Sequence, residues 1–186
     1  MAKKLATLLL LMGSAFAQDQ ADAARNAAGC GVNQAQFTVK TDNKQHPIAQ
    51  SQTGKAVVYV FGDEEIDNIT LHIGGVTTRW GLDGSWVGAN YRKSYFFFYA
   101  DPGDHRICTS RQSSLKSQTK ISSAISFTAE AGKAYYFRTK TPRHQEAHSP
   151  ENEMILEAVD PAAAQLLIAN SAFSISHPKP PAKDDE

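Results

Sequence analysis

Short segments of β-branched and aromatic residues, separated by turn residues, recur along most of this chain and constrain its fold more than any other feature. The segment 94–100 reads S-Y-F-F-F-Y-A and is followed at 101–104 by Asp-Pro-Gly-Asp. Segments of this kind, bounded by Gly, Pro and Asp, are typical of β-strands. Their repetition, with a turn about every 8–12 residues, predicts a mainly β chain folded as an antiparallel β-sandwich or an open barrel.

We expect about eight to ten short strands in a single domain. The polar stretches 111–120 and 141–153 have no strand pattern and are predicted to be loops. The segments with strand character are 36–40, 55–61, 69–73, 76–82, 85–87, 94–100, 105–110, 121–128, 133–140, 154–159 and 172–176.

The clearest single element is a hairpin at Asp83-Gly84. Asp-Gly between two strand-like segments is a strong hairpin pattern, because both residues tolerate the positive φ angles of a type I′ turn. We expect Trp86 to lie over Gly81, on the face opposite Trp80. The predicted pairs are Leu82 with Ser85, Gly81 with Trp86, and Trp80 with Val87.

One helix is predicted near the C-terminus. Asp160 can cap its N-terminus, Pro161 suits the first helical position, and 162–169 are good helix formers. We therefore expect one β-domain over 30–176, with this helix covering one edge or face. The Pro-rich and charged segment 177–186 is predicted to be a disordered tail.

Residues 1–17 have the three parts of a secretory signal peptide. Lys3 and Lys4 precede an apolar segment over 5–12, and Ala-Phe-Ala at 15–17 places small residues where a signal peptidase cleaves. The alternative is an N-terminal helix of the folded domain. We predict cleavage between Ala17 and Gln18, a flexible segment over 18–29, and export to the periplasm or the medium.

Cys30 and Cys108 are the two cysteines of the chain. In an oxidising compartment they most simply form one disulfide, which closes a loop of roughly 79 residues. A metal site would need further ligands at suitable spacing, and a catalytic thiol would need a histidine-rich site beside it. Lipidation at Cys30 is disfavoured, because a polar stretch separates it from the apolar segment 5–12.

The charge balance excludes a strongly basic binding protein. The chain has 19 Lys+Arg and 19 Asp+Glu, and loss of residues 1–17 removes two lysines, which leaves 17 − 19 = −2. Nucleic-acid binders carry a basic patch, so no nucleic-acid partner is predicted. The sequence contains no phosphate-binding loop, metalloprotease helix or serine-hydrolase elbow. His144 and His148 lie on a predicted loop, and we predict no metal site and no cofactor.

The consecutive aromatic residues of 95–99 are the candidate binding feature. A strand turns its side chains alternately to both faces, so the aromatic rings can all belong to the core of a sandwich. Alternatively, one face joins Trp86 and Tyr91 in an exposed platform that stacks a sugar or a peptide. The candidate platform residues are Trp86, Tyr91, Tyr95, Phe97 and Tyr99.

Several motifs resemble a bacterial exported family catalogued as domain of unknown function 2846. They are G-L-D-G-S-W-V-G-A-N at 81–90, S-Y-F-F-F-Y-A-D-P-G-D-H-R-I-C at 94–108, F-T-A-E-A-G-K-A-Y-Y-F-R at 127–138 and L-L-I-A-N-S-A-F-S-I-S-H-P-K at 166–179. The resemblance covers about 28–179. It implies a recurring cysteine pair, here Cys30 and Cys108, and it implies no established activity, cofactor or catalytic residue.

A more distant likeness is to the small β-domains called PEGA, which have a D-G-x-x-V-G hairpin followed by a P-G-x-H turn. This likeness implies a compact sandwich of the kind found in envelope-associated proteins. The matching residues are Asp83, Gly84, Val87, Gly88, Pro102, Gly103 and His105.

Taken together, these patterns predict an exported, soluble, non-enzymatic domain that binds an envelope protein or glycan and has no transmembrane segment. One alternative is a periplasmic hydrolase whose site uses His105, Asp101 and Asp104. The other is a structural protein of the envelope.

Overall fold

The computed structural model describes residues 35–63, 76–114, 122–140 and 154–180. Within these ranges the chain forms ten strands and one helix. The elements are β1 (Phe37–Asp42), β2 (Ala56–Gly62), β3 (Thr77–Leu82), β4 (Ser85–Asn90), β5 (Ser94–Ala100), β6 (Gly103–Gln112), β7 (Ser122–Ala129), β8 (Ala134–Lys140), β9 (Ile155–Ala158), α3 (Pro161–Asn170) and β10 (Ala172–Pro178).

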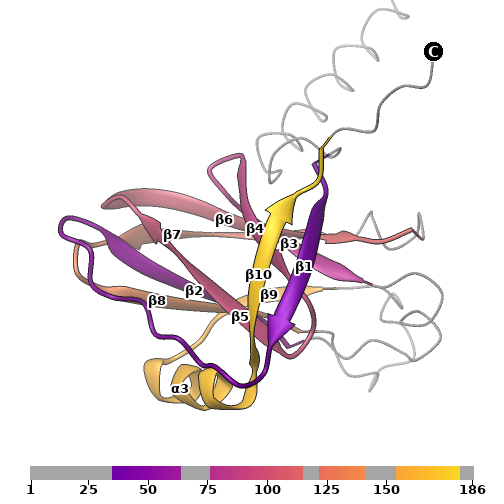
Figure 1. The fold of residues 1–186 in the computed structure, drawn as a ribbon. Helices are drawn as coiled ribbons and strands as arrows, with labels where there is room; N and C mark the ends of the chain where they lie inside the picture. The colour runs from indigo at the N-terminus through magenta and orange to yellow at the C-terminus, as the bar shows by residue number, and fades with distance from the viewer. Residues whose placement is uncertain (1–34, 64–75, 115–121, 141–153, 181–186) are drawn as a thin grey trace, which may run out of the picture.

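The strands form two sheets that pack as a sandwich (Figure 1). Sheet A has the order β1-β10-β5-β2-β8-β9, and sheet B has the order β4-β3-β6-β7. The predicted mainly β sandwich with one C-terminal helix is therefore confirmed. Sheet A is mixed rather than purely antiparallel, because β2 pairs with β8 and β10 pairs with β5 in parallel.

A hydrophobic core fills the space between the two sheets. Its largest member is Trp80 of β3, which is fully buried beside Val58 and Val60 of β2, Phe96 of β5 and Ile107 of β6. Burying each such side chain contributes about 1.5–3 kcal/mol relative to leaving it in water. This core holds the two sheets together.

A second apolar layer lies on the other face of sheet A, under α3. Tyr59 and Phe61 of β2 and Tyr95 of β5 pack there against Ala164 of the helix. Strand β2 is consequently covered on both faces, which explains why its sequence is apolar almost throughout instead of alternating. The sequence predicts a helix that covers one edge or one face of the sandwich, and the observed helix covers a face of sheet A.

The hairpin at 83–84 has the predicted turn and a different register beyond it. Asp83 and Gly84 have φ angles of 51° and 82°, as a type I′ turn requires. The expected pairing of Trp80 with Val87 is wrong, because a bulge places Gly88 opposite Trp80. A Cβ at Gly88 would lie 2.8 Å from the ring of Phe96. The bulge therefore places a glycine where the core has no room for a side chain. The pairs Leu82–Ser85 and Gly81–Trp86 are as predicted.

Helix α3 begins as the sequence indicates. The carboxylate of Asp160 accepts hydrogen bonds from Ala162 N and Ala163 N, each at 3.0 Å, and Pro161 occupies the first turn. Ser171 ends the helix. No helix among the described residues is long and apolar enough to cross a membrane.

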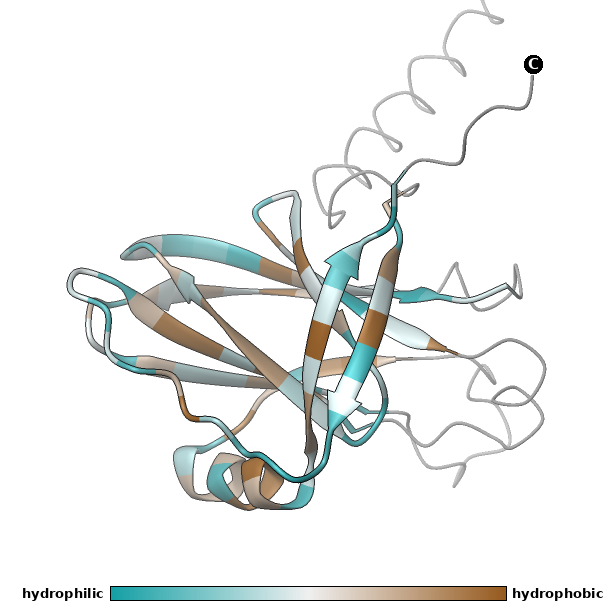
Figure 2. Cartoon of the chain, viewed as in Figure 1, coloured by the Kyte–Doolittle hydropathy of each residue, from teal (hydrophilic) through white to brown (hydrophobic). Residues whose placement is uncertain are grey.

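Two strands extend into segments that the sequence predicts to be irregular. Strand β6 continues to Gln112, into the predicted polar loop, because its end pairs with the start of β3. Strand β10 continues to Pro178, into the predicted disordered tail, because it pairs with β1 along its length. Hydrophobic and hydrophilic residues alternate along β1 and β10 (Figure 2). The predictions for 1–30, 69–73, 141–153 and 181–186 lie outside the described residues.

Candidate functional site

Three of the candidate platform residues lie together on the outer face of sheet A, where the protein buries Tyr95, half-buries Phe97 and leaves Tyr99 exposed. Tyr95 is fully buried, and its hydroxyl donates to Pro47 O at 2.9 Å. Phe97 lies 5.8 Å from Phe173, measured between ring centroids. Tyr99 is 36% exposed, and its hydroxyl donates to Gln50 O at 2.7 Å. This face therefore holds the segment 47–50.

Burial raises the pKa of Tyr95 to about 12. It also raises the pKa of Tyr59, whose hydroxyl accepts a hydrogen bond from Ala49 N at 2.8 Å. Both phenols therefore stay protonated at physiological pH.

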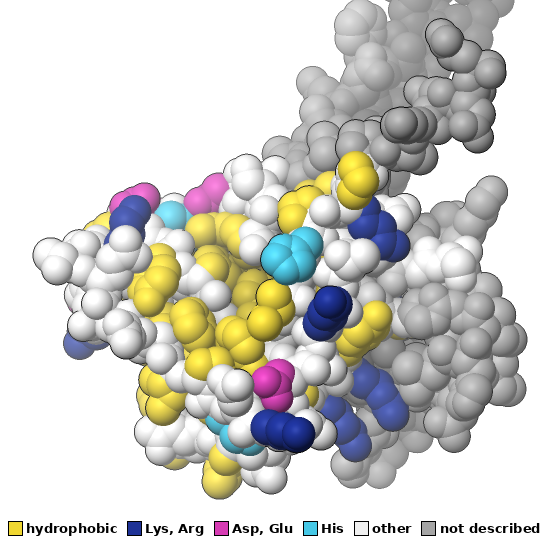
Figure 3. Space-filling model, viewed as in Figure 1, with side chains coloured by type: hydrophobic (Ala, Val, Ile, Leu, Met, Phe, Trp, Pro, Cys, Tyr) yellow, Lys and Arg dark blue, Asp and Glu magenta, His cyan; other side chains and the backbone are white. Residues whose placement is uncertain are grey.

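In the space-filling view, hydrophobic side chains gather on the visible face with scattered charged groups around them (Figure 3).

The remaining platform candidates lie elsewhere. Trp86 belongs to sheet B, and the guanidinium Cζ of Arg79 lies 4.4 Å from its ring centroid. Because Trp80 points into the core, Arg79 and Trp86 are on the outer face of sheet B. Tyr91 follows β4, is 39% exposed and lines a groove beside β1. The structure thus does not join Trp86 and Tyr91 with Tyr95 in one surface.

Cys108 lies in the middle of β6 and is 1% exposed. Ile107 and Thr109 point into the core, so Cys108 faces the outer side of sheet B, between Gly81 on β3 and Ala124 on β7. Cys30, its predicted partner, lies outside the described residues.

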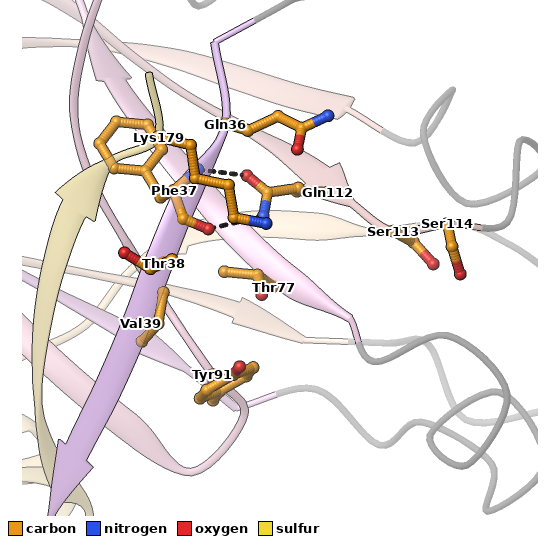
Figure 4. Close-up of a pocket in the computed structure, with 10 residues that line it drawn as sticks. All are labelled: Gln36, Phe37, Thr38, Val39, Thr77, Tyr91, Gln112, Ser113, Ser114 and Lys179. Atoms are coloured by element: carbon orange, nitrogen blue, oxygen red, sulfur yellow. Dashed lines mark hydrogen bonds between the residues drawn. The ribbon is translucent and has the colours of Figure 1, made fainter. Parts of the chain in front are cut away.

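The groove beside β1 has a volume of about 460 Å³ (Figure 4). Strand β1 forms one wall, from Phe37 to Val39. Thr77, Tyr91 and Gln112 form the opposite side, from the beginning of β3, the end of β4 and the end of β6. Sequence reasoning missed this groove, since its lining residues come from five separate stretches of chain.

Gln112 joins the two walls at one end of the groove. Its Oε1 accepts a hydrogen bond from Phe37 N at 2.7 Å, and its Nε2 donates to Phe37 O at 2.8 Å (Figure 4). A side-chain amide thereby takes the place that a residue of a neighbouring strand would occupy. Lys179 is the single charged side chain among the described residues that line the groove, so the groove has a positive end.

A second polar cluster surrounds His105, which sequence reasoning grouped with Asp101 and Asp104. The structure instead pairs its Nδ1 with the carboxylate of Asp83 at 2.6 Å, and its Nε2 with the main-chain carbonyl of Asp101 at 2.7 Å. The Asp101 carboxylate accepts from Lys55, and that of Asp104 accepts from Thr128. The pairing of β3 with β6 brings Asp83 and His105 together, and only knowledge of that pairing could have predicted it.

Both partners of the His105 ring are acceptors, so the site favours the doubly protonated ring, in which both nitrogens donate. Burial by itself lowers the pKa of His105, but the hydrogen bond to the Asp101 carbonyl and the bond and charge of Asp83 outweigh it and raise the pKa. Burial likewise raises the pKa of Asp83, while the Arg106 N–H and His105 lower it more, so the net shift is downward. The cluster links the β3–β4 turn to the β5–β6 turn.

Neither cluster provides a metal site: no group of three or more His, Cys, Asp and Glu side chains among the described residues could hold an ion. His144 and His148 lie outside those residues. A comparison of the chain with protein-family models, curated proteins and solved structures finds no match. The resemblance to exported domains stays a prediction from the quoted motifs.

Proposed function

We propose that this protein is an exported, non-enzymatic β-sandwich domain that binds a component of the bacterial envelope, a protein or a glycan, in the groove beside β1. The observation that carries the proposal is the composition of that groove. It combines a partly exposed aromatic ring, Tyr91, with amide and hydroxyl groups and one cation, Lys179, in a volume of about 460 Å³. Pockets that bind ligands combine an aromatic contact with a few polar groups in this way.

Export is the part of the proposal that rests on residues 1–17, with cleavage between Ala17 and Gln18. An oxidising destination goes with a disulfide between Cys30 and Cys108. Such a disulfide would fix the N-terminal stretch of the mature chain against sheet B.

The anchoring of Ala35 supports this pairing. Ala35 O accepts a hydrogen bond from Arg79 Nη1 at 2.7 Å, and Arg79 Nη2 donates to Ser110 Oγ at 3.1 Å. Ser110 and Cys108 lie on the same face of β6, about 7 Å apart along the strand. The chain between Cys30 and Ala35 can span up to about 17 Å. Cys30 is therefore within reach of Cys108.

The hydrolase alternative has less support. A general base needs a ring nitrogen free to accept a proton. Both ring nitrogens of His105 are engaged by Asp83 and Asp101, in a link between two turns. The composition of the groove supports a binding function, whereas the bonds of the His105 cluster do not support catalysis.

The proposal is tested by cosedimentation of the purified mature chain with an envelope fraction. Tyr91→Ala is expected to lower the bound fraction roughly fivefold, because it removes the aromatic contact from the groove. Tyr99→Ala is the matched control, since Tyr99 is exposed to a similar extent, 36% against 39%, and lies on the outer face of sheet A. Equal binding by the wild type and Tyr91→Ala would contradict the proposal.

A further inference from the structure

We propose that the occupant of the groove is an extended segment of another polypeptide, which adds to the free edge of β1 as a further strand and places an acidic side chain beside Lys179. This inference rests on the proposed binding function and specifies the ligand class for the same groove. The geometry of β1 carries it.

The free edge of β1 presents main-chain groups in a fixed pattern. In the antiparallel ladder with β10, Gln36 O accepts from Lys179 N at 2.7 Å, so Gln36 faces β10. Alternate residues of such a strand turn both their N–H and C=O groups to the same partner. Phe37, Val39 and Thr41 therefore turn theirs away from β10, toward the groove and the edge that continues from it.

One of these positions is already occupied in the way a strand would occupy it. The Gln112 carboxamide bonds both main-chain groups of Phe37, at 2.7 and 2.8 Å. No described residue forms a main-chain hydrogen bond with the outward groups of Val39 or Thr41. The edge thus offers two successive strand-pairing positions, Val39 and Thr41, about 7 Å apart. The third position, Phe37, is blocked by the Gln112 carboxamide.

This arrangement fits a peptide better than a glycan. A peptide backbone repeats a donor and an acceptor at the spacing of Val39 and Thr41, and edge strands recruit extended segments through such groups. Natural proteins usually cover or obstruct an edge of this kind. Here the side-chain amide of Gln112 covers only the Phe37 end.

Side chains around the edge add selectivity. Tyr91 lies across the groove from Val39 (Figure 4) and offers an apolar contact for alternate side chains of the incoming strand. Lys179 is at the Gln112 end, and no described residue lining the groove carries a negative charge. An acidic residue at that end of the peptide is therefore favoured.

The test uses a randomised library of linear octapeptides, selected on the mature, oxidised protein. Enriched peptides are expected to have β-branched residues at alternate positions and Asp or Glu at one end. Val39→Pro removes the outward N–H and keeps the bonds to β10, because proline is tolerated where an edge-strand N–H faces away from its sheet. The dissociation constant should rise about tenfold for this variant, and similarly for peptides N-methylated at the pairing residue.

Val39→Thr is the matched control, since it keeps the N–H and should bind within about twofold of the wild type. Thermal melting verifies that Val39→Pro is folded, and Thr41→Pro repeats the experiment at the next outward position. The inference is overturned if no peptide is enriched, or if enriched peptides bind Val39→Pro as tightly as the wild type. In that case, a loss of envelope binding in Tyr91→Ala would still support the groove as the site, whereas failure of both experiments would remove the proposed function as well.

Discussion

At the scale of single residues, the charge state of His105 has the clearest physical consequence. Its bond to the Asp83 carboxylate joins two turns that are distant in sequence, whereas its bond to the Asp101 carbonyl is local, to a residue four positions earlier. The raised pKa of His105 and the lowered pKa of Asp83 mean that the folded state favours the charged form of each group. Linkage then makes the stability of the fold depend on pH.

The sign differs between the two groups. The raised pKa of His105 contributes stability that is fully present below its ordinary value of 6.5 and is lost as the pH rises through the folded value. The lowered pKa of Asp83 contributes stability that is present above its ordinary value of 3.8 and is lost as the pH falls through the folded value. The pair therefore stabilises the protein most between these two ordinary values.

We predict that His105→Gln is less stable than the wild type by about 0.5–1 kcal/mol near pH 5.5, a modest value because the carboxylate is half exposed and screened by solvent. The difference should shrink toward pH 9, as the pH rises through the raised pKa of the wild-type ring. Urea unfolding at both pH values measures it. A difference that is the same at both would show that the ring stabilises the turns without its charge.

At the scale of elements, α3 depends on one side chain for its beginning. Asp160 satisfies two N–H groups that the helix itself cannot bond. The helix also covers the aromatic layer of sheet A, so fraying at its first turn would expose Tyr59 and Tyr95.

Asp160→Ala is therefore expected to lower the free energy of unfolding by about 1 kcal/mol. Asp160→Asn keeps an acceptor oxygen and should retain most of the stability that the cap contributes. This variant is therefore the control for the loss of charge. Chemical denaturation followed by tyrosine fluorescence checks both variants. If both variants lose the same free energy of unfolding, the effect comes from the charge of Asp160 and not from its capping hydrogen bonds.

At the scale of the whole molecule, the proposed disulfide joins the N-terminal stretch to the centre of sheet B. Closing a loop of roughly 79 residues stabilises the folded state by about 4.5 kcal/mol at most, through the entropy removed from the unfolded chain. Cys108 is 1% exposed, so the bridge would be shielded from reductants.

We predict that protein recovered from the envelope compartment begins at Gln18 and yields a peptide pair linked through Cys30 and Cys108. The double variant Cys30→Ser, Cys108→Ser should have a free energy of unfolding lower than that of the wild type by up to about 4.5 kcal/mol. Wild-type protein reduced under denaturing conditions should be as unstable as this variant. Mass spectrometry of unreduced digests tests the link. Intact protein in the cytoplasm with both thiols open to alkylation would contradict both the export and the disulfide.

The amount of this fold that could be predicted follows from the range of the interactions. Strand β5, the Asp83-Gly84 turn and the Asp160 cap depend on residues a few positions apart, and all were predicted from the sequence. The observed pairing of Trp80 with Gly88, in place of the predicted Val87, was not, because it depends on whether Phe96 leaves room for a side chain at 88.

The candidate site shows the same division more sharply. The sequence by itself determined where the ten described strands lie, apart from their exact ends, and that Tyr95 and Tyr99 share a face. Only the tertiary structure decided that this face is covered at Tyr95, and that a groove opens elsewhere, between Phe37 and Gln112, which are 75 positions apart. Alternation and turn chemistry act within a few residues, whereas the pairing of distant strands is decided by which side chains pack together once the sheets meet.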